Sequence, residues 1–118
     1  MEVNGWVRLG AAVLALGVIA GAFGAHALDV TPERMDVWQT AARYHLVHGL
    51  GLCLVGVLRP VPVWTGRLFC AGILLFSGSL YTLVLTDTPW LGAITPLGGL
   101  SFIVGWAIIA AFPRKSGN

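Results

Sequence analysis

Long stretches of apolar residues without formal charge constrain this chain more than any other feature. Three of them cover residues 9–28, 68–85 and 88–112, and a fourth begins just after Arg43. A helix of about 20 apolar residues matches the hydrocarbon thickness of a bilayer. Four such segments in a chain of 118 residues leave no room for a soluble domain. The sequence therefore predicts an all-α integral membrane protein.

The composition supports the same class. Hydrophobic residues make up 57% of the chain and charged residues only 10%, whereas soluble domains carry about 25% charged residues. The net charge is +2, and the charges lie almost entirely between the apolar stretches. We therefore expect the lipid bilayer as the main partner, with other membrane subunits or a second copy as further candidates, and no nucleic acid.

Helix-start and helix-stop signals divide the chain into four spans. Thr31, Pro32 and Glu33 supply a capping residue, a first-turn proline and a first-turn acid, and Pro60 and Pro62 end the helix that begins there. Thr95-Pro96 repeats the start signal. We expect a single transmembrane domain over 1–118, with spans at about 9–28, 37–58, 68–85 and 94–112.

The distribution of basic residues predicts the orientation. With four spans, one side of the membrane carries five basic residues, namely Arg8, Arg59, Arg67, Arg114 and Lys115. The other side carries Arg34, with Arg43 nearby, among four acidic residues. The excess of basic residues favours both termini in the cytoplasm, and thus a multi-pass protein of the plasma (inner) membrane. Trp6 and Trp64 would mark the inner interface, and Trp38 and Trp90 the outer one.

Small residues predict how the helices pack. Helices in lipid associate closely where small side chains let their backbones approach. The candidates for such contacts are Gly17, Gly21, Gly24, Ser77, Gly78, Ser79, Gly98 and Gly99. We expect a compact four-helix bundle.

Ionisable and polar residues inside the second span are the main candidates for function. Arg43, Tyr44, His45 and His48 lie there, and His26 lies near the end of the first span. An ionisable residue within a membrane span marks a functional site or an internal pair. At 1.5 Å per residue, Arg43 lies about 9 Å and His48 about 16 Å inside Val37. The helix is polar on two faces at one level, which predicts a central position in the bundle.

Several roles for these residues remain open. One hypothesis is that the histidines hold haem or a metal. The other ligands of a metal set are not evident, however, and we expect no metal site. The alternative hypothesis is that they are neutral and hydrogen-bonded to Ser79, Tyr81 or Thr82. For Arg43 the two hypotheses are an ion pair with Asp29, Asp36 or Asp87, and a bond to a ligand. A polar pocket on the outer side, lined by His26, Arg43, Tyr44, His45 and His48, could receive a quinone or lipid headgroup.

Catalysis and proton transport find little support in the sequence. A nucleophile with an adjacent base, an HExxH motif, paired carboxylates and a phosphate-binding glycine loop are all missing. The cytoplasmic half of the spans contains no acid or histidine to continue a proton relay. We therefore expect a protein that is not an enzyme and has no obligatory cofactor.

Four strings of residues resemble one family. They are Phe23-Gly24-Ala25-His26-Ala27-Leu28, Tyr44-His45-Leu46-Val47-His48-Gly49, Phe76-Ser77-Gly78-Ser79-Leu80-Tyr81 and Ile94-Thr95-Pro96-Leu97-Gly98-Gly99. Together they are similar to the domain-of-unknown-function 423 family of small membrane proteins. The resemblance implies a four-span inner-membrane protein without an established activity. It also implies that His26, His45, His48, Ser79, Tyr81, Thr95 and Pro96 belong to the family pattern.

Three hypotheses for function follow. The first is a noncatalytic accessory or assembly subunit of a membrane complex. The second is a bundle that binds a small molecule, such as a quinone, haem or a lipid headgroup, in the outer polar pocket. The third is a minimal transporter that works as an oligomer, although nothing polar marks its inner half.

Overall fold

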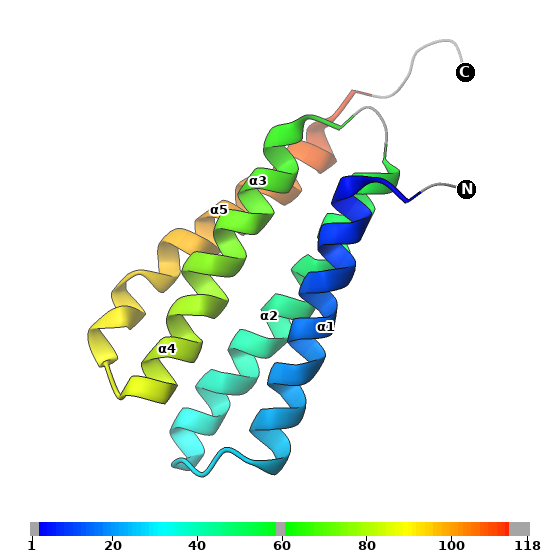
Figure 1. The fold of residues 1–118 in the computed structure, drawn as a ribbon. Coiled ribbons are helices and arrows are strands. Elements are labelled where there is room, and N and C mark those ends of the chain that lie inside the picture. The colour runs from blue at the N-terminus through cyan, green and yellow to red at the C-terminus, as the bar shows by residue number, and fades with distance from the viewer. Residues whose placement is uncertain (1–2, 59–60, 114–118) are drawn as a thin grey trace.

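The computed structural model describes residues 3–58 and 61–113, which form a bundle of four long helices (Figure 1). The first two are α1 (Gly5–His26) and α2 (Pro32–Val57). The third is continuous and consists of α3 (Val63–Gly72), the π-helical η1 (Ile73–Gly78) and α4 (Ser79–Thr86). A short 3-10 helix, η2 (Pro89–Ala93), leads into α5 (Thr95–Ala111).

The starts of α1 and α2 follow local capping chemistry, whereas α5 begins at Thr95 without a side-chain cap, so the expected cap at Thr95 is wrong. The Thr31 hydroxyl accepts a hydrogen bond from the Arg34 backbone N–H at 3.3 Å, with Pro32 in the first turn, as the sequence predicts. At the start of α1, the Asn4 side chain accepts from the Val7 N–H at 3.0 Å and donates to the Gly56 carbonyl at 2.5 Å. Asn4 therefore both caps α1 and ties it to the end of α2.

In the described part of the chain, three helical segments are long and apolar enough to cross a membrane: Gly5–His26, Val63–Thr86 and Pro89–Ala111. They overlap the expected spans 9–28, 68–85 and 94–112, and the chain is a membrane helical bundle. The fourth expected span, 37–58, lies in α2 but is not among these candidates. The physical reason is that its arginine and two histidines lower its mean hydropathy.

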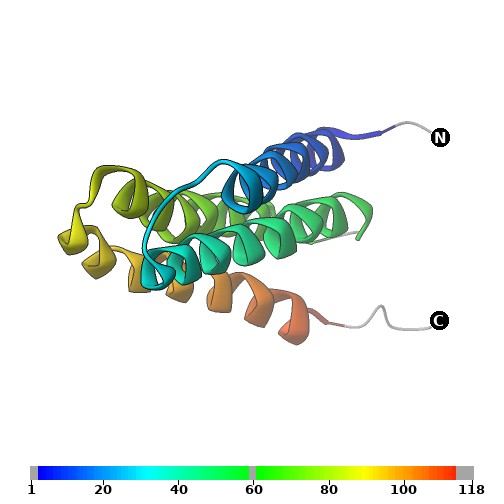
Figure 2. The same cartoon turned by 90° about the horizontal axis from the view of Figure 1, so that it is seen from below.

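The polar helix α2 occupies the centre of the bundle. It packs against α1 on one side and against α3, η1 and α4 on the other, while α5 packs against α3 and η1 (Figure 2). Ten of its 26 residues are buried, against three of 22 in α1 and three of 17 in α5. The central position expected for this helix is confirmed.

Close approach between α1 and α2 depends on glycine. A Cβ atom at Gly10 would lie 2.8 Å from both the Cys53 backbone nitrogen and the Gly49 carbonyl oxygen. A Cβ at Gly17 would lie 2.6 Å from the Leu46 side chain, and one at Gly24 would lie 2.5 Å from Trp38. These spacings are below contact distance, so α1 packs against α2 along its whole length only because the side chains are absent.

Among the other glycines expected at helix contacts, the structure separates two groups. A Cβ at Gly98 would collide with the backbone of Phe76, so α5 packs closely against η1 there. Gly21 has open space where a Cβ would be, and the nearest atoms at Gly78 and Gly99 lie 3.7 Å and 3.8 Å away. These three glycines do not mark close contacts within the described chain.

Trp38 differs from its expected place at the outer interface. Its side chain is only 5% exposed, and its indole N–H donates to the Ala20 carbonyl at 2.8 Å. The indole packs on Tyr81 with ring centroids 4.6 Å apart. The space opposite Gly24 accommodates the ring and the Ala20 carbonyl satisfies its N–H, so Trp38 is a core residue.

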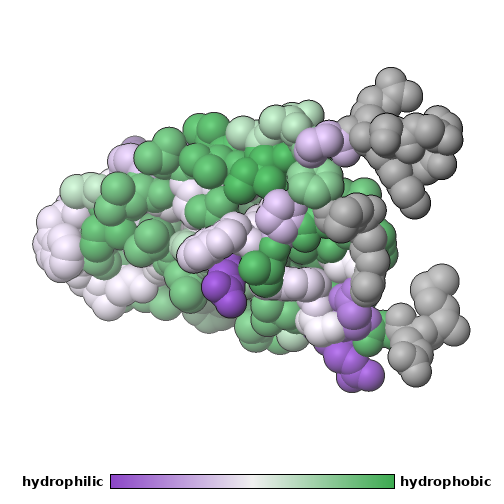
Figure 3. Space-filling view, turned by 90° about the horizontal axis from the view of Figure 1, so that it is seen from above, coloured by the Kyte–Doolittle hydropathy of each residue, from purple (hydrophilic) through white to green (hydrophobic). Residues whose placement is uncertain are grey.

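The two ends of the bundle differ in the connections they carry. The start of α1 and the end of α5 lie at one end, which we call the terminal end (Figure 1). The connections over 27–31 and 87–94 lie at the other, which we call the distal end. Between them the surface is mostly apolar, and strongly hydrophilic residues are few on the face in view (Figure 3). This is the surface expected of a protein surrounded by lipid.

Candidate functional site

His45 of α2 joins three helices. Its Nε2 lies 2.8 Å from the Val13 carbonyl oxygen of α1, and its Nδ1 lies 2.9 Å from the Tyr81 hydroxyl of α4. A carbonyl oxygen only accepts, so Nε2 carries the proton and donates. In the neutral ring Nδ1 then accepts from the Tyr81 hydroxyl. The side chain is 7% exposed, and both of its nitrogens are engaged within the chain.

His48 adopts the opposite tautomer. Its Nδ1 donates to the Tyr44 carbonyl at 2.7 Å, and its Nε2 lies 2.9 Å from the indole Nε1 of Trp106 in α5. An indole N–H can only donate, so Nε2 must be unprotonated and the ring neutral. Phe102 stacks on the ring at a centroid distance of 3.5 Å. His48, 3% exposed, therefore links α2 to α5.

The sequence anticipated part of this network. Tyr81, one of three hydroxyls expected to bond a neutral histidine, contacts His45. The partner of His48 is Trp106, which the sequence analysis missed. A signal was present, because a tryptophan inside an apolar span needs an acceptor for its indole N–H.

Serines around the π-helical segment bind it to its neighbours. Ser77 is fully buried and donates to the Ala41 carbonyl of α2 at 2.8 Å. The Ser79 hydroxyl bonds the Thr95 hydroxyl at the start of α5 at 2.8 Å. The expected packing residues Ser77 and Ser79 thus act through their hydroxyl groups as well as through small size.

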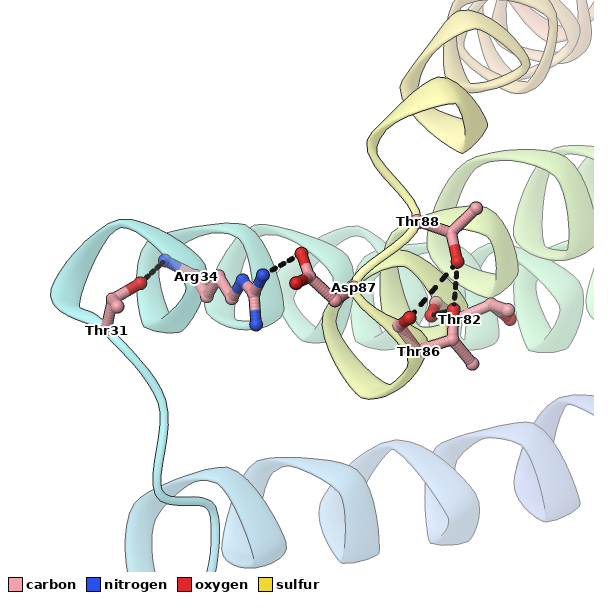
Figure 4. Close-up of polar contacts among 6 residues, drawn as sticks. All are labelled: Thr31, Arg34, Thr82, Thr86, Asp87 and Thr88. Atoms are coloured by element: carbon pink, nitrogen blue, oxygen red, sulfur yellow. Dashed lines mark hydrogen bonds and ion pairs between the residues drawn. The ribbon is translucent and has the colours of Figure 1, made fainter.

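Arg43 has no partner of the kind expected. Its side chain is exposed, and within residues 3–58 and 61–113 the structure gives it no ion pair or hydrogen bond. Asp87 instead pairs with Arg34, which reaches from α2 to the end of α4 (Figure 4). The expected pairing of Arg43 with Asp87 is wrong because Arg43 points away from α4, about 160° around α2 from His45.

His26 also lies apart from the α2 histidines. It is the last residue of α1 and is exposed at the distal end. The five residues proposed for one outer pocket therefore occupy different environments: His45 and His48 are buried, Tyr44 is 42% exposed, and His26 and Arg43 are on the surface. The structure does not gather them into one pocket. In the described part of the chain, no three His, Cys, Asp or Glu side chains lie together as a metal site would need.

Two of these residues, Tyr44 and His48, line a groove between α2 and α5. Its volume is about 380 Å³, and it is lined by Tyr44, Val47, His48, Phe76, Gly99, Phe102, Ile103 and Trp106. A second cavity of about 360 Å³ adjoins it and shares Val47 and Trp106, together with Leu50, Gly51 and Leu54. We call the two together the α2–α5 groove. Sequence reasoning missed it because its walls come from three helices.

Comparisons with known proteins agree on one family. The pattern of the family described as "Protein of unknown function (DUF423)" matches residues 20–99. A UPF0382 membrane protein, YwdK of Bacillus subtilis, is 45% identical, with 93% of this chain and 96% of the relative covered. Relatives of the same description from Staphylococcus haemolyticus and Staphylococcus aureus are 44% and 45% identical, covering 88% and 91% of this chain and 90% and 94% of theirs. No solved structure matches the chain.

Proposed function

The chain belongs to the DUF423 family of multi-pass membrane proteins of unknown function, and within that family we propose that it is a noncatalytic accessory or assembly subunit of a membrane complex. One observation carries the proposal. All four ring nitrogens of His45 and His48 are engaged by partners inside the bundle. The polar groups of the interior thus hold helices together.

A catalytic role would need a reactive group with a free lone pair or proton facing a substrate. His45 and His48 would each have to break an internal hydrogen bond to offer one. Such a break would leave a buried polar group unpaired, which costs about 1–3 kcal/mol. This cost favours a structural role for both residues. The bundle would then act through its contacts with the other subunits of the complex.

We further propose that α2 crosses the membrane as the fourth span and that both termini are cytoplasmic. Two observations support this threading. The helix lies alongside α1, which is apolar enough to span, and the start of α1 and the end of α5 share one end of the bundle (Figure 1). Arg8 and Arg67 lie toward that end, whereas Asp29, Asp36 and Asp87 lie toward the other. Basic residues favour the cytoplasmic side.

The subunit role is tested by native mass spectrometry of the tagged protein, extracted gently from its own membrane. The expected result is a mass that includes other polypeptides in fixed proportion. A parallel extraction in a harsher detergent, which should release those polypeptides, is the control for nonspecific carry-over. A bundle that runs alone at every stage of mild extraction would contradict the proposal.

A small-molecule-binding bundle is the second candidate function, and the α2–α5 groove favours it. Haem or metal ligation by His48 would have to displace the Trp106 indole from Nε2. A quinone or a lipid would leave that bond intact and would contact the apolar wall of the groove. A quinone or a lipid therefore suits the groove better than haem or a metal ion does.

A further inference from the structure

We propose that the α2–α5 groove holds a hydrocarbon chain of an anionic phospholipid whose phosphate binds Arg43. The proposal names the ligand of the second candidate function and does not depend on the subunit role. It rests on the place of Arg43, the course of the groove and the chemistry of its walls.

Arg43 needs an anion that the described chain does not supply. It lies about 9 Å inside Val37. It is part of an exposed strip along one face of α2 that runs from Asp36 to Leu54. A guanidinium stays charged at any physiological pH, and an arginine at membrane depth is almost always paired. The nearest carboxylate on the same strip, Asp36, is seven residues away, or about 10 Å along the helix axis.

The direction of the side chain favours a lipid phosphate. Helical side chains tilt toward the N-terminus of their helix, and for α2 that is the distal end of the bundle. A long arginine side chain can extend from this depth to the headgroup level. Its planar group binds phosphate oxygens in a bidentate manner. Arg43 is thus placed to hold a headgroup at the distal surface.

The groove continues inward from Arg43. Val47 follows Arg43 by one helical turn on the same face of α2, and it lines both parts of the groove. From Tyr44 to Leu54 the groove runs about 15 Å along the helix axis. A chain whose phosphate sits on Arg43 therefore enters the groove directly below its headgroup.

The walls suit a hydrocarbon chain. The only strongly polar side chains in the wall besides Tyr44 are His48 and Trp106, and they bond each other at 2.9 Å. Phe102 and Phe76 present aromatic faces, 5.7 Å apart between centroids. The phenol of Tyr44, which is 42% exposed, lies at the end of the groove nearest Arg43. A polar ligand would find few partners deeper in the groove.

Gly99 keeps the groove open and supplies a test. A Cβ there would meet nothing closer than Phe76 at 3.8 Å, which is ordinary contact. Gly99→Leu should therefore project into the groove without a collision at the Cβ. Gly21→Leu is a matched control, because Gly21 also has open space but lies on α1, outside the groove.

The experiment uses the full chain, purified in a neutral detergent and delipidated. Phosphatidylglycerol and phosphatidylcholine with identical chains are titrated in, and native mass spectrometry counts the bound lipid. The wild type should prefer phosphatidylglycerol about fivefold, the factor expected when one arginine faces an anionic headgroup instead of the zwitterionic headgroup of phosphatidylcholine. Arg43→Gln should bind both lipids equally, Gly99→Leu should lose both, and Gly21→Leu should behave as the wild type.

Three results would overturn the proposal: no lipid preference in the wild type, an unchanged preference in Arg43→Gln, or unchanged binding in Gly99→Leu. Helicity and melting temperature confirm that each variant is folded. Arg43→Gln also preserves the groove, so it keeps the headgroup test valid if Gly99→Leu does not fold. If Gly99→Leu lost its lipid but kept its co-purifying polypeptides, lipid binding and the subunit role would be independent of each other.

Discussion

At the scale of the residue, the hydrogen bond between His48 and Trp106 leads to the most specific prediction about stability. Trp106→Phe removes the indole donor and leaves the buried Nε2 of His48 unpaired, since its ring is 3% exposed. We expect a loss of about 1 kcal/mol in the free energy of unfolding, because such bonds are weaker in membrane proteins than the desolvation cost alone suggests.

Thermal or denaturant unfolding in detergent measures this loss. Trp90→Phe is the matched control, since Trp90 is 67% exposed and η2 contains no buried residue. Equal stability of the two variants would show that the His48 bond contributes nothing to the bundle.

The sequence predicted that the polar residues of α2 lie inside the bundle or against it, but not which groups they meet. The spacing of His45 and His48 on one face of a helix is a local property that 3.6 residues per turn determines. Whether Arg43 or another residue of α2 meets Asp87 depends on how α2 is rotated against α4. That rotation is set by contacts such as Ser77 with Ala41, which join residues 36 positions apart.

At the scale of the element, the structure predicts different effects on stability for alanine substitutions at two adjacent glycines of α5. Gly98→Ala places a Cβ against the backbone of η1, whereas Gly99→Ala makes only an ordinary contact at 3.8 Å. Overpacking of this kind costs about 1–3 kcal/mol, so Gly98→Ala should destabilise the bundle by that amount. Gly99→Ala should leave its stability within about 0.5 kcal/mol of the wild type.

Detergent unfolding followed by tryptophan fluorescence compares the two variants. The substitutions are chemically identical and one residue apart, so helix propensity and chain entropy cancel between them. Equal unfolding free energies for the two variants would contradict the close approach of α5 to η1.

The start of α2 was predictable at this scale, whereas Thr95, expected to cap the last helix, lies inside α5 and bonds Ser79 instead. The start of α2 at Pro32 follows from Thr31 and Pro32 themselves, and these signals are local. The π-helical turn over Ile73–Gly78 has no such signal in the sequence. A π-helical turn is stabilised by its surroundings, here the bonds of Ser77 and Ser79 to α2 and to Thr95.

At the scale of the whole molecule, the threading predicts accessibility from the two sides of the membrane. Cysteines introduced at Val30 and Asp87, both in connections at the distal end, should react with an impermeant thiol reagent applied outside intact cells. A cysteine at Pro62, in the connection between α2 and α3, should react only after the membrane is opened.

The wild type is the control for the labelling, because its own Cys53 and Cys70 lie within helices. Labelling of Pro62→Cys from outside together with Val30→Cys would mean that α2 lies on the surface and does not cross the bilayer.

The apolar segments of the sequence identified the class of the whole molecule, and in the described residues three of them form helices long and apolar enough to cross a membrane. The α2–α5 groove could not be predicted from the sequence. Its walls combine Tyr44, Phe76 and Gly99 from three helices. The backbone of α5 packs closely against α3 and η1, whereas α5 meets α2 through long side chains such as Trp106.

The claim that the buried histidines hold the bundle together is tested most directly by the nitrogen chemical shifts of ¹⁵N-labelled histidine in bilayer samples. His45→Gln and His48→Gln assign the signals. At neutral pH we expect two neutral rings of opposite tautomer, protonated at Nε2 in His45 and at Nδ1 in His48, because the first must donate to Val13 and the second must accept from Trp106. A charged ring, or the same tautomer at both positions, would contradict the structural role.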